Sequence, residues 1–469
     1  MRHHCGLFGI WGHPEAVSLT YLGLYAQQHR GQESAGICSL DAGRIQRHAG
    51  MGLVTEVFSP RTIEKLRAPV AIGHVRYSTT GSCHQTNAQP LLVNYSRGEV
   101  AVAHNGNLIN AGLLRKEYEE HGAIFATTSD TEVIVHLLAK PAHCDKPNPV
   151  AHVLTHLQGA YSLLFLFPDR MIAARDPFGF RPLVLGRLEN GGIVAASETC
   201  ALDIVDAKFL REVLPGEVVT ITDAGMKSEW IAQPGTVRPA HCIFEQIYFA
   251  DPASDVFGEN VHAARRAMGA QLAREAPVDA DLVLPIPNCA RCAALGYANE
   301  SGLQYGRGFT VSHYAGRSFI MPEQTQRDLA VKMKLNVIKE NVRDRRLIVV
   351  EDSVVRGTTT RGKIGALRRA GAREIHLRVA SPPIRHPCYF GIDFPNPAEL
   401  IANTRSVEEI REYLGVDSLH YLSLEGMLSC VKHPGRNYCT ACFSGQYPMP
   451  VDQPVSKFAL ERHQLRMFE

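Results

Sequence analysis

The sequence lacks an excess of charge of either sign and lacks any long uninterrupted apolar run. Its 469 residues carry 49 lysines and arginines against 47 aspartates and glutamates, so bulk electrostatics gives no reason to expect nucleic-acid or anionic-membrane binding. No apolar run approaches the roughly 20 residues that span a bilayer, and the opening Met-Arg-His-His-Cys has no secretory core. We therefore expect a cytoplasmic protein that binds neither nucleic acid nor membrane.

An export signal being absent, the 12 cysteines are not expected to form disulfides. Cytoplasmic cysteines that do more than fill a core are usually nucleophiles or metal ligands. The candidates here are Cys5, Cys242, Cys388 and the pair Cys439 and Cys442. The chain is long enough for two or three domains.

The most informative stretch runs from Leu347 to Thr360. Leu347 to Val350 predict a short buried parallel strand, and Glu351 and Asp352 stand where it would end. Gly357 to Thr360 then open a helical pattern, and a helix N-terminus with hydroxyls suits a phosphate. The carboxylates suit sugar hydroxyls or Mg²⁺. The alternative is an acidic strand end followed by a polar helix cap.

The second half alternates strand and helix patterns, which predicts a βαβ core with a parallel sheet. Ile243–Phe249 also has a strand-like composition. A helix start at Asn288 and Cys289 suits a pyrophosphate, and the polar segment 314–335 is typical of a lid. The expected strands are 281–285, 347–350 and 374–379, and the expected helices are 290–300 and 359–370.

The first half, residues 5 to about 230, has dense strand patterns with helices beside them. This predicts a layered α+β domain built on antiparallel sheets. Pro234, Gly235 and Pro239 indicate a linker before the second half. The expected strands are 7–11, 70–75, 100–104, 161–167, 171–174 and 193–196, and the expected helices are 16–28, 110–121 and 131–138.

Cys5 stands four residues from the chain start, where a terminal α-amino group can act as its general base. The alternative is a buried cysteine on a first strand. Arg76 at a strand end suits bidentate capture of a carboxylate, and Asn105 beside Gly106 suits an oxyanion hole. Asp130 opens a helix and either caps it or holds an ammonium group. Each of these also has an ordinary turn or cap interpretation.

Together these motifs resemble the N-terminal-nucleophile glutamine amidotransferases. The resemblance implies a four-layer α/β/β/α domain over residues 5–232 that hydrolyses glutamine. Cys5 would attack the amide, with Asn105 and Gly106 stabilising the oxyanion. The implied glutamine-binding residues are Arg76 for the α-carboxylate, Asp130 for the α-ammonium, and Thr79 and Arg30 lining or closing the pocket.

The stretch 347–360 resembles the phosphoribosyl diphosphate (PRPP) signature of the type I phosphoribosyltransferases, which implies such a domain over residues 242–448. Mg²⁺ would lie at Glu351, Asp352 and Cys289. The implied PRPP-binding residues are Glu351, Asp352 and Ser353 for ribose or Mg²⁺, Gly357, Thr358, Thr359 and Thr360 for the 5-phosphate, and Asn288 and Cys289 for the pyrophosphate.

A glutaminase followed by a phosphoribosyltransferase resembles the amidophosphoribosyltransferase family, iron–sulfur-containing type. The resemblance implies that glutamine, PRPP and water give 5-phosphoribosylamine, glutamate and pyrophosphate, the first committed step of purine biosynthesis, with ammonia passing internally. It also implies purine nucleotides as feedback inhibitors and a homotetramer. The alternative is a non-catalytic PRPP- or purine-nucleotide-binding regulatory protein, since Asn288, Cys289 and Glu351 depart from the usual pattern.

The remaining cysteines offer two metal sites. The resemblance to iron–sulfur members implies that Cys242, Cys388, Cys439 and Cys442 bind a structural [4Fe–4S] cluster. A second C-x-x-C, Cys289 and Cys292, leaves open a Cys₄ zinc site with Cys439 and Cys442.

A nucleophile that uses its own α-amino group must be the first residue of the mature chain. We therefore predict that Met1–His4 is removed as a short propeptide. Intact-mass measurement of the active protein is expected to show Cys5 at the N-terminus. Full glutaminase activity in a chain that retains Met1–His4 would contradict this prediction.

Overall fold

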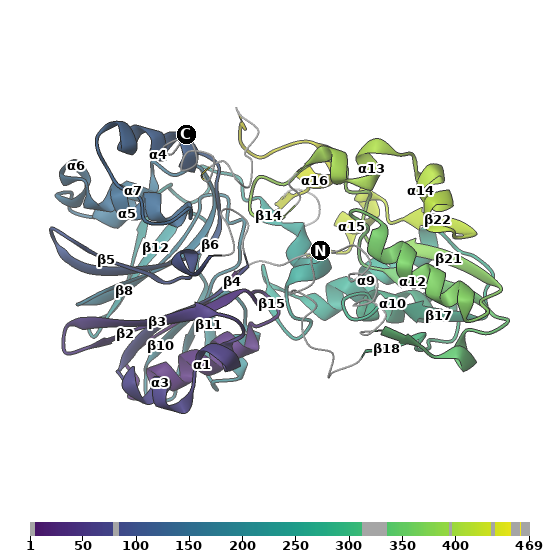
Figure 1. Ribbon diagram of the computed structural model, residues 1–469, viewed down its shortest axis with the longest axis horizontal. Coiled ribbons are helices and arrows are strands. Elements are labelled where there is room, and N and C mark those ends of the chain that lie inside the picture. The colour runs from purple at the N-terminus through teal and green to yellow at the C-terminus, as the bar shows by residue number, and fades with distance from the viewer. Residues whose placement is uncertain are drawn as a thin grey trace.

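The computed structural model describes residues 5–77, 84–311, 335–393, 396–432, 437–451 and 460. These residues form two lobes that lie side by side along the long axis of the molecule (Figure 1). Strands up to Trp230 build the first lobe, and the second lobe follows from His241. Thr79, the predicted propeptide 1–4 and nearly all of the predicted lid 314–335 lie outside the described residues.

The first lobe contains two antiparallel sheets. The seven-stranded sheet has the order β11-β9-β10-β1-β4-β2-β3 and the six-stranded sheet the order β13-β12-β8-β7-β6-β5. The strands are β1 Gly6–Trp11, β2 Ser34–Asp41, β3 Arg44–Met51, β4 Val70–Arg76, β5 Leu91–Tyr95, β6 Gly98–Leu108, β7 Gly159–Phe167, β8 Arg170–Arg175, β9 Val184–Arg187, β10 Ile193–Ala196, β11 Lys208–Glu212, β12 Glu217–Thr222 and β13 Gly225–Trp230.

Alternating side chains on the central strands produce four layers, because successive residues of a strand point to opposite faces. On β1, Leu7 packs into the core shared by the two sheets, whereas Phe8 packs toward the helices that cover the outer face. On β7, Leu164 joins the core between the sheets and Phe165 the core under the other helices. The predicted α/β/β/α architecture is confirmed.

The covering helices of the first lobe fall into two groups. Those packed on the seven-stranded sheet include α1 and α8, and those packed on the six-stranded sheet include α4, α5 and α7. The helices are α1 Ala16–Ala26, α2 Val54–Val57, α3 Pro60–Lys65, α4 Ala111–Glu120, α5 Thr131–Ala139, α6 Pro141–Cys144, α7 Pro149–Leu154 and α8 Cys200–Asp203.

The second lobe is built on a parallel sheet of order β17-β20-β21-β22. Ile348 of β20 packs toward α9 and α10, and Val349 packs toward α12 and α14, so helices cover both faces of the predicted parallel sheet. The main elements are α9 Val261–Glu275, β17 Leu282–Pro285, α10 Arg291–Ser301, β20 Arg346–Glu351, α12 Thr358–Arg369, β21 Glu374–Val379, α14 Val407–Leu414 and β22 Ser418–Tyr421.

Shorter elements complete this lobe. Two of the strands, β14 and β23, pair in parallel and bring the start of the lobe beside the end of the chain. The shorter elements are β14 His241–Cys242, β15 Asp255–Val256, β16 Glu259–Asn260, β18 Phe309–Val311, β19 Leu335–Val337, β23 Tyr438–Cys439, α13 Ile401–Thr404, α15 Leu424–Ser429 and α16 Ala441–Ser444.

The predicted strand over Ile243–Phe249 is wrong. Glu245–Phe249 forms a buried π-helical turn, η2. The turn satisfies groups that a strand would leave apart: Gln246 Nε2 donates to Val256 O (2.8 Å), and Arg265 Nε donates to Gln246 O (2.7 Å). Tertiary contacts therefore override the β-propensity of this apolar and aromatic segment.

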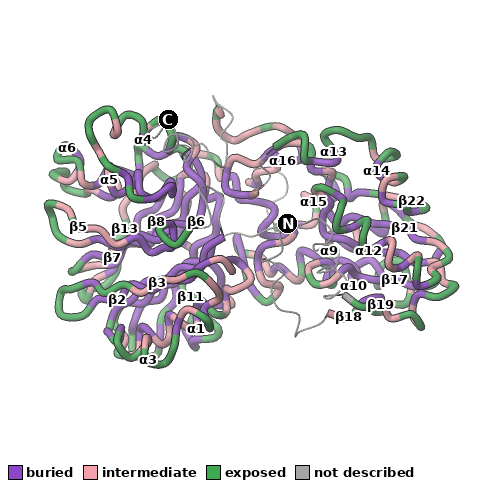
Figure 2. Tube along the Cα trace, in the orientation of Figure 1, coloured by how far each residue is buried: buried purple, intermediate pink, exposed green. Residues whose placement is uncertain are grey.

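The junction between the lobes is itself buried (Figure 2). Cys242 N donates to Phe180 O (3.1 Å), and the rings of Phe180 and Phe390 stack with centroids 4.3 Å apart. Burial of aromatic rings across a boundary favours one fixed arrangement of the lobes. None of the described helices combines the length and apolar character needed to cross a bilayer.

Candidate active sites

Cys5 lies directly before β1, at the edge of the lobe that faces the junction. Its thiol donates to Tyr77 O (3.6 Å). Burial raises the pKa of Cys5 to about 11, against the opposing effect of the Tyr77 hydrogen bond and the Arg76 charge. At neutral pH the thiol is therefore protonated, and a nucleophilic role requires a base to remove its proton.

Arg76 and Asp130 share the surroundings of Cys5, although they are far apart in sequence. Arg76 ends β4, the neighbour of β1, and the Gly6–Val75 pairing brings that end beside Cys5. Asp130 precedes α5, and its Oδ2 accepts from Leu108 N (2.9 Å). The charges of both side chains act on the Cys5 thiol. The structure thus brings together a thiol, a cation and an anion, which suits an amino-acid substrate.

The Asp130 carboxylate stays ionised despite its burial. Burial alone would raise its pKa, but His104, the Leu108 N–H and the Arg76 charge together lower the pKa below its usual value. His104 Nδ1 lies 3.6 Å from Asp130 Oδ1. A buried, ionised carboxylate of this kind can receive an ammonium group.

Asn105 of β6 is fully buried, and neither atom of its amide group has a hydrogen-bond partner among the described residues. An unpaired buried amide costs about 1–3 kcal/mol, a cost that a bound ligand can remove. At the adjacent Gly106, a Cβ would stand 1.9 Å from Ala160 O. Only glycine therefore fits beside Asn105, which agrees with an oxyanion hole at this position.

Arg30 differs from the expectation that it lines or closes the glutamine pocket. Its side chain is completely buried, and its Nε donates to Cys5 O (3.0 Å). The other guanidinium nitrogens donate to Glu198 and, at 2.9 and 3.0 Å, to Glu245. With these bonds made, Arg30 holds the backbone of Cys5 and does not present its charge to a ligand.

Arg30 belongs to a group of two arginines and two glutamates that crosses the junction and that we term the buried charge cluster. All four side chains have zero exposure. Glu245 of η2 also accepts from Arg181 Nη1 (3.2 Å). Glu198 accepts from Asp251 N (2.7 Å) and Ser254 Oγ (2.8 Å) of the second lobe. The cluster comprises Arg30, Arg181, Glu198 and Glu245.

Sequence reasoning missed the buried charge cluster, because its members lie in separate segments without a common motif. β6, which carries Asn105 and which we term the oxyanion strand, makes a further contact that sequence reasoning missed: Asn107 Nδ2 donates to Tyr389 O (2.8 Å). Tyr389 follows Cys388, and Arg181 Nη2 donates to Phe390 O (2.7 Å). One short segment of the second lobe, Cys388 to Phe390, therefore contacts both the oxyanion strand and the buried charge cluster.

The predicted phosphate loop lies at the carboxyl end of β20, where parallel sheets bind ligands. Gly357 stands immediately before α12 with φ of +76°, and a Cβ there would meet Ile401 Cδ1 at 2.8 Å. Glycine is thus required for the turn that presents the α12 N-terminus and its threonines. This placement agrees with the predicted phosphate site.

Glu351 and Asp352 are both buried at the start of this loop. Burial raises the pKa of both carboxyls, and their mutual repulsion raises that of Glu351 further, against the Lys363 ammonium. Lys363 Nζ lies 3.4 Å from Glu351 Oε1, and Thr360 Oγ1 donates to Glu351 Oε2 (3.3 Å). The Lys363 ammonium, joined at Asp352 by the Arg265 charge, only partly offsets these effects, because the pKa of both carboxyls stays raised. The site therefore suits a bound cation. Lys363 was not predicted.

Asn288 and Cys289 lie on the neighbouring loop, because β17 pairs with β20 in the register Pro285–Val350. Burial raises the pKa of Cys289 to about 12, and the charges of Asp352 and Glu351 add to this effect. The two predicted halves of the PRPP site therefore meet. A neutral thiol is a poor ligand for Mg²⁺, which prefers oxygen, so the chemistry of the site favours the carboxylates over Cys289.

The four cysteines of the expected iron–sulfur site also come together. The β14–β23 pairing sets Cys242 opposite Cys439, and the pKa of Cys442 is raised first by burial and then by Cys388, Cys439 and Cys242. Burial is likewise the main cause of the raised pKa values of the other three. Four cysteine side chains gathered in one buried place offer the thiolate ligands of a metal centre, which would have to displace their protons on binding.

A mononuclear zinc site is not supported by this geometry. Zinc–sulfur bonds of about 2.3 Å place four ligand sulfurs about 3.8 Å apart. Within the described ranges, no cysteine belongs to a group of metal-ligand atoms that all lie within 4.8 Å of one another. The alternative zinc site that combines Cys289 and Cys292 with Cys439 and Cys442 is therefore not supported by the placement of the described cysteines.

Comparisons with known proteins extend over both lobes. Residues 74–203 match the family described as glutamine amidotransferase domain. The chain is 46% identical to amidophosphoribosyltransferase of Bacillus subtilis over 97% of this chain and 96% of that protein. It is 47% identical to the chloroplastic amidophosphoribosyltransferase 2 of Arabidopsis thaliana, over 97% and 81%.

Among solved structures, the chain is similar to the B. subtilis glutamine PRPP amidotransferase in complex with ADP and GMP. The TM-score is 0.90 at 45% identity, with 97% of this chain and 99% of that chain covered. A structure described as the allosteric regulatory enzyme of purine biosynthesis gives a TM-score of 0.92 with the same identity and coverage. The similarity therefore extends over both lobes and both sites.

Replacing Glu245 by glutamine tests the role of the buried charge cluster. The change leaves two buried guanidinium groups with one carboxylate, and breaking such a pair costs about 3–5 kcal/mol. We expect a lower melting temperature and a larger loss of glutamine-dependent than of ammonia-dependent activity, because Arg30 holds Cys5. Melting curves and the two rates are compared with those of Glu425→Gln, an exposed control. An unchanged melting temperature, or equal losses of both rates, would contradict the assignment.

Proposed function

The chain belongs to the amidophosphoribosyltransferase family, and on that basis we propose how its residues divide the reaction between two sites. The family converts PRPP to 5-phosphoribosylamine with nitrogen from glutamine, the first step of purine biosynthesis. The observation that carries the division is the grouping of Cys5, Arg76 and Asp130 in one lobe and of Glu351 and Asp352 in the other.

In the first lobe, we assign amide hydrolysis to Cys5. Its Sγ attacks the glutamine side-chain amide after passing its proton to the Cys5 α-amino group, which requires removal of Met1–His4. Arg76 binds the α-carboxylate and Asp130 the α-ammonium group of glutamine. Asn105 Nδ2 and the backbone N–H of Gly106 stabilise the oxyanion. The role of Thr79 stays a prediction.

In the second lobe, we assign ribose and Mg²⁺ binding to Glu351 and Asp352. Mg²⁺, when bound, would neutralise charge on the pyrophosphate leaving group. Ser353 Oγ donates to Asp352 Oδ1 (2.6 Å) and orients that carboxylate. The α12 N-terminus, from Gly357 through Thr358, Thr359 and Thr360, binds the 5-phosphate. Asn288 and the Cys289 loop bind the pyrophosphate, with Cys289 as a neutral thiol.

The four cysteines Cys242, Cys388, Cys439 and Cys442 are proposed to hold a [4Fe–4S] cluster. Its role is structural: it would join the end of the chain to β14 at the start of the second lobe. Because Cys388 immediately precedes Tyr389, which contacts Asn107 (2.8 Å), a bound cluster would also fix the segment that supports the oxyanion strand.

Ammonia released at Cys5 is proposed to reach PRPP through the junction between the lobes, which limits its protonation by bulk water. The ADP and GMP of the B. subtilis complex support nucleotide binding here, and we propose purine nucleotides as feedback inhibitors. The homotetramer and the cytoplasmic location stay predictions. The non-catalytic alternative is disfavoured, because a pure binding protein needs no buried thiol, cation and carboxylate arranged around glutamine.

Two substitutions separate the half-reactions. Cys5→Ala is expected to lower glutamine-dependent synthesis by at least about 10³-fold, as removal of a nucleophile does, while ammonia-dependent synthesis persists. Asp352→Asn is expected to lower both syntheses by about 10²-fold and to leave glutaminase activity measurable. Pyrophosphate and glutamate release are followed for both variants and for Cys430→Ala as a control. Glutamine-dependent synthesis by Cys5→Ala would contradict the assignment of Cys5, and full synthesis by Asp352→Asn that of Asp352.

Iron analysis tests the cluster. Protein purified without oxygen is expected to be brown and to contain iron and acid-labile sulfide in the proportions of a [4Fe–4S] cluster. Cys242→Ser is expected to lose most of this iron and to melt at a lower temperature. The control Cys430→Ser is expected to keep the iron content and the melting temperature of the wild type. A colourless wild-type protein that contains zinc would refute the cluster.

A further inference from the structure

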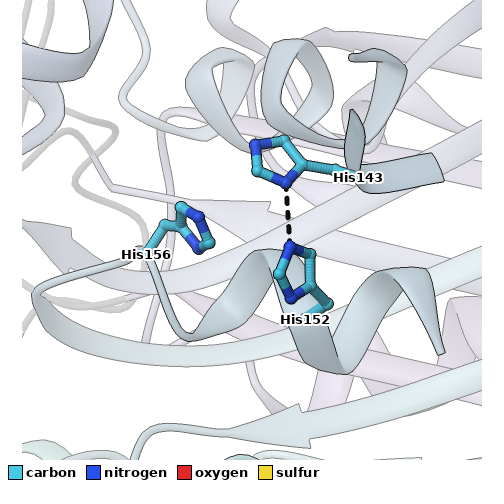
Figure 3. Close-up of side chains that lie close together, drawn as sticks. All are labelled: His143, His152 and His156. Atoms are coloured by element: carbon cyan, nitrogen blue, oxygen red, sulfur yellow. Dashed lines mark hydrogen bonds between the residues drawn. The ribbon is translucent and has the colours of Figure 1, made fainter. Parts of the chain in front are cut away.

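Three histidines converge on the outer helical layer of the first lobe, away from both active sites. His143 lies in α6, His152 in α7, and His156 two residues beyond the end of α7. One ring nitrogen from each histidine lies within 4.8 Å of the others, and no other described group of three or more metal-ligand side chains meets this distance. The three imidazoles surround a common space (Figure 3).

We propose that His143, His152 and His156 bind one divalent transition-metal ion of the zinc type. Imidazole is a preferred ligand of Zn²⁺, Co²⁺ and Ni²⁺, whereas Mg²⁺ prefers oxygen. Three histidines leave a position for water, as in other three-histidine zinc sites. The proposal is independent of the function of the two active sites.

The separation of two of the three imidazoles is close to that which a tetrahedral ion requires. Zinc–nitrogen bonds of about 2.0–2.1 Å place ligand nitrogens about 3.3 Å apart. His143 Nδ1 and His152 Nε2 are 3.0 Å apart and share a hydrogen bond, which a metal would replace. The His143 ring centroid lies 4.7 Å from that of His156. His156 is exposed, so its ring can turn toward an ion held by the other two imidazoles.

The protonation state also favours metal binding. Burial lowers the pKa of His143 and His156, and the neighbouring imidazoles lower both further. Neutral imidazole is the form that binds metal. The positive charges of Lys140 and Lys146 repel a cation at this site. Both side chains are exposed, so solvent screens their charge. At His156, the Glu117 charge opposes the effect of Lys140.

A metal at this site would join α6 to α7 across the exposed connection 145–148. α5 packs against both helices and begins directly after Asp130. The ion would therefore stiffen the support of α5 without contacting glutamine. We expect a gain in thermal stability and no direct part in catalysis.

Cobalt titration of the full-length protein tests the site, because Co²⁺ reports its ligands spectroscopically. Excess Mg²⁺ is added to occupy oxygen sites. The wild type is expected to bind one high-affinity equivalent with the weak visible bands of nitrogen and oxygen ligation and without a sulfur-to-cobalt charge-transfer band. Loss of a neighbour that only orients a metal ligand costs about 10–100-fold in affinity. His156→Ala, which removes a ligand itself, is expected to lose about 100-fold or more.

His156→Ala removes an exposed side chain, and His152→Ala serves as a second variant. Circular dichroism verifies that both are folded. His420→Ala, which removes an exposed histidine of β22, is the matched control and should bind like the wild type. Zn²⁺ is expected to raise the melting temperature of the wild type and of this control only. The absence of saturable binding, a sulfur charge-transfer band for the high-affinity equivalent, or wild-type affinity in both folded histidine variants would overturn the proposal.

Discussion

The arrangement of the two lobes depends on one buried electrostatic interaction, the pairing of Arg30 and Arg181 with Glu198 and Glu245. Buried charges are tolerated only when their partners are in place. Here Glu198 of the first lobe accepts hydrogen bonds from Asp251 and Ser254 of the second, and Glu245 of the second lobe accepts from Arg30 and Arg181 of the first. The same guanidinium that completes the group holds the Cys5 carbonyl. Arg30 therefore links the contact between the lobes to the position of the Cys5 backbone.

Both sites lie where strands end, and the reason differs between the lobes. In the first lobe, antiparallel pairing of β1 and β4 brings Cys5 beside Arg76, while β6 supplies Asn105 from the second sheet. In the second lobe, parallel pairing of β17 and β20 places two successive loops at one edge, as open parallel sheets do. The chain therefore builds an amide-hydrolysing site and an anion-binding site from two different sheet topologies.

The segment from Cys388 to Phe390 connects three features that sequence alone keeps apart. It carries one of the four clustered cysteines, its Tyr389 carbonyl accepts from Asn107, and its Phe390 carbonyl accepts from Arg181. Through these two backbone carbonyls, the segment that carries Cys388 lies against both β6 and the buried charge cluster.

The sequence by itself predicted most of the element types, the antiparallel or parallel character of the main sheets and the chemistry of residues such as Cys5, Asp130 and Glu351, because periodicity and side-chain type are local properties. The tertiary structure decided which distant groups meet. It turned Arg30 from a pocket residue into a buried partner of Glu245, folded Glu245–Phe249 as a turn against its β-propensity, and gathered His143, His152 and His156. Such pairings depend on how whole sheets and helices pack, and no short stretch of sequence contains that information.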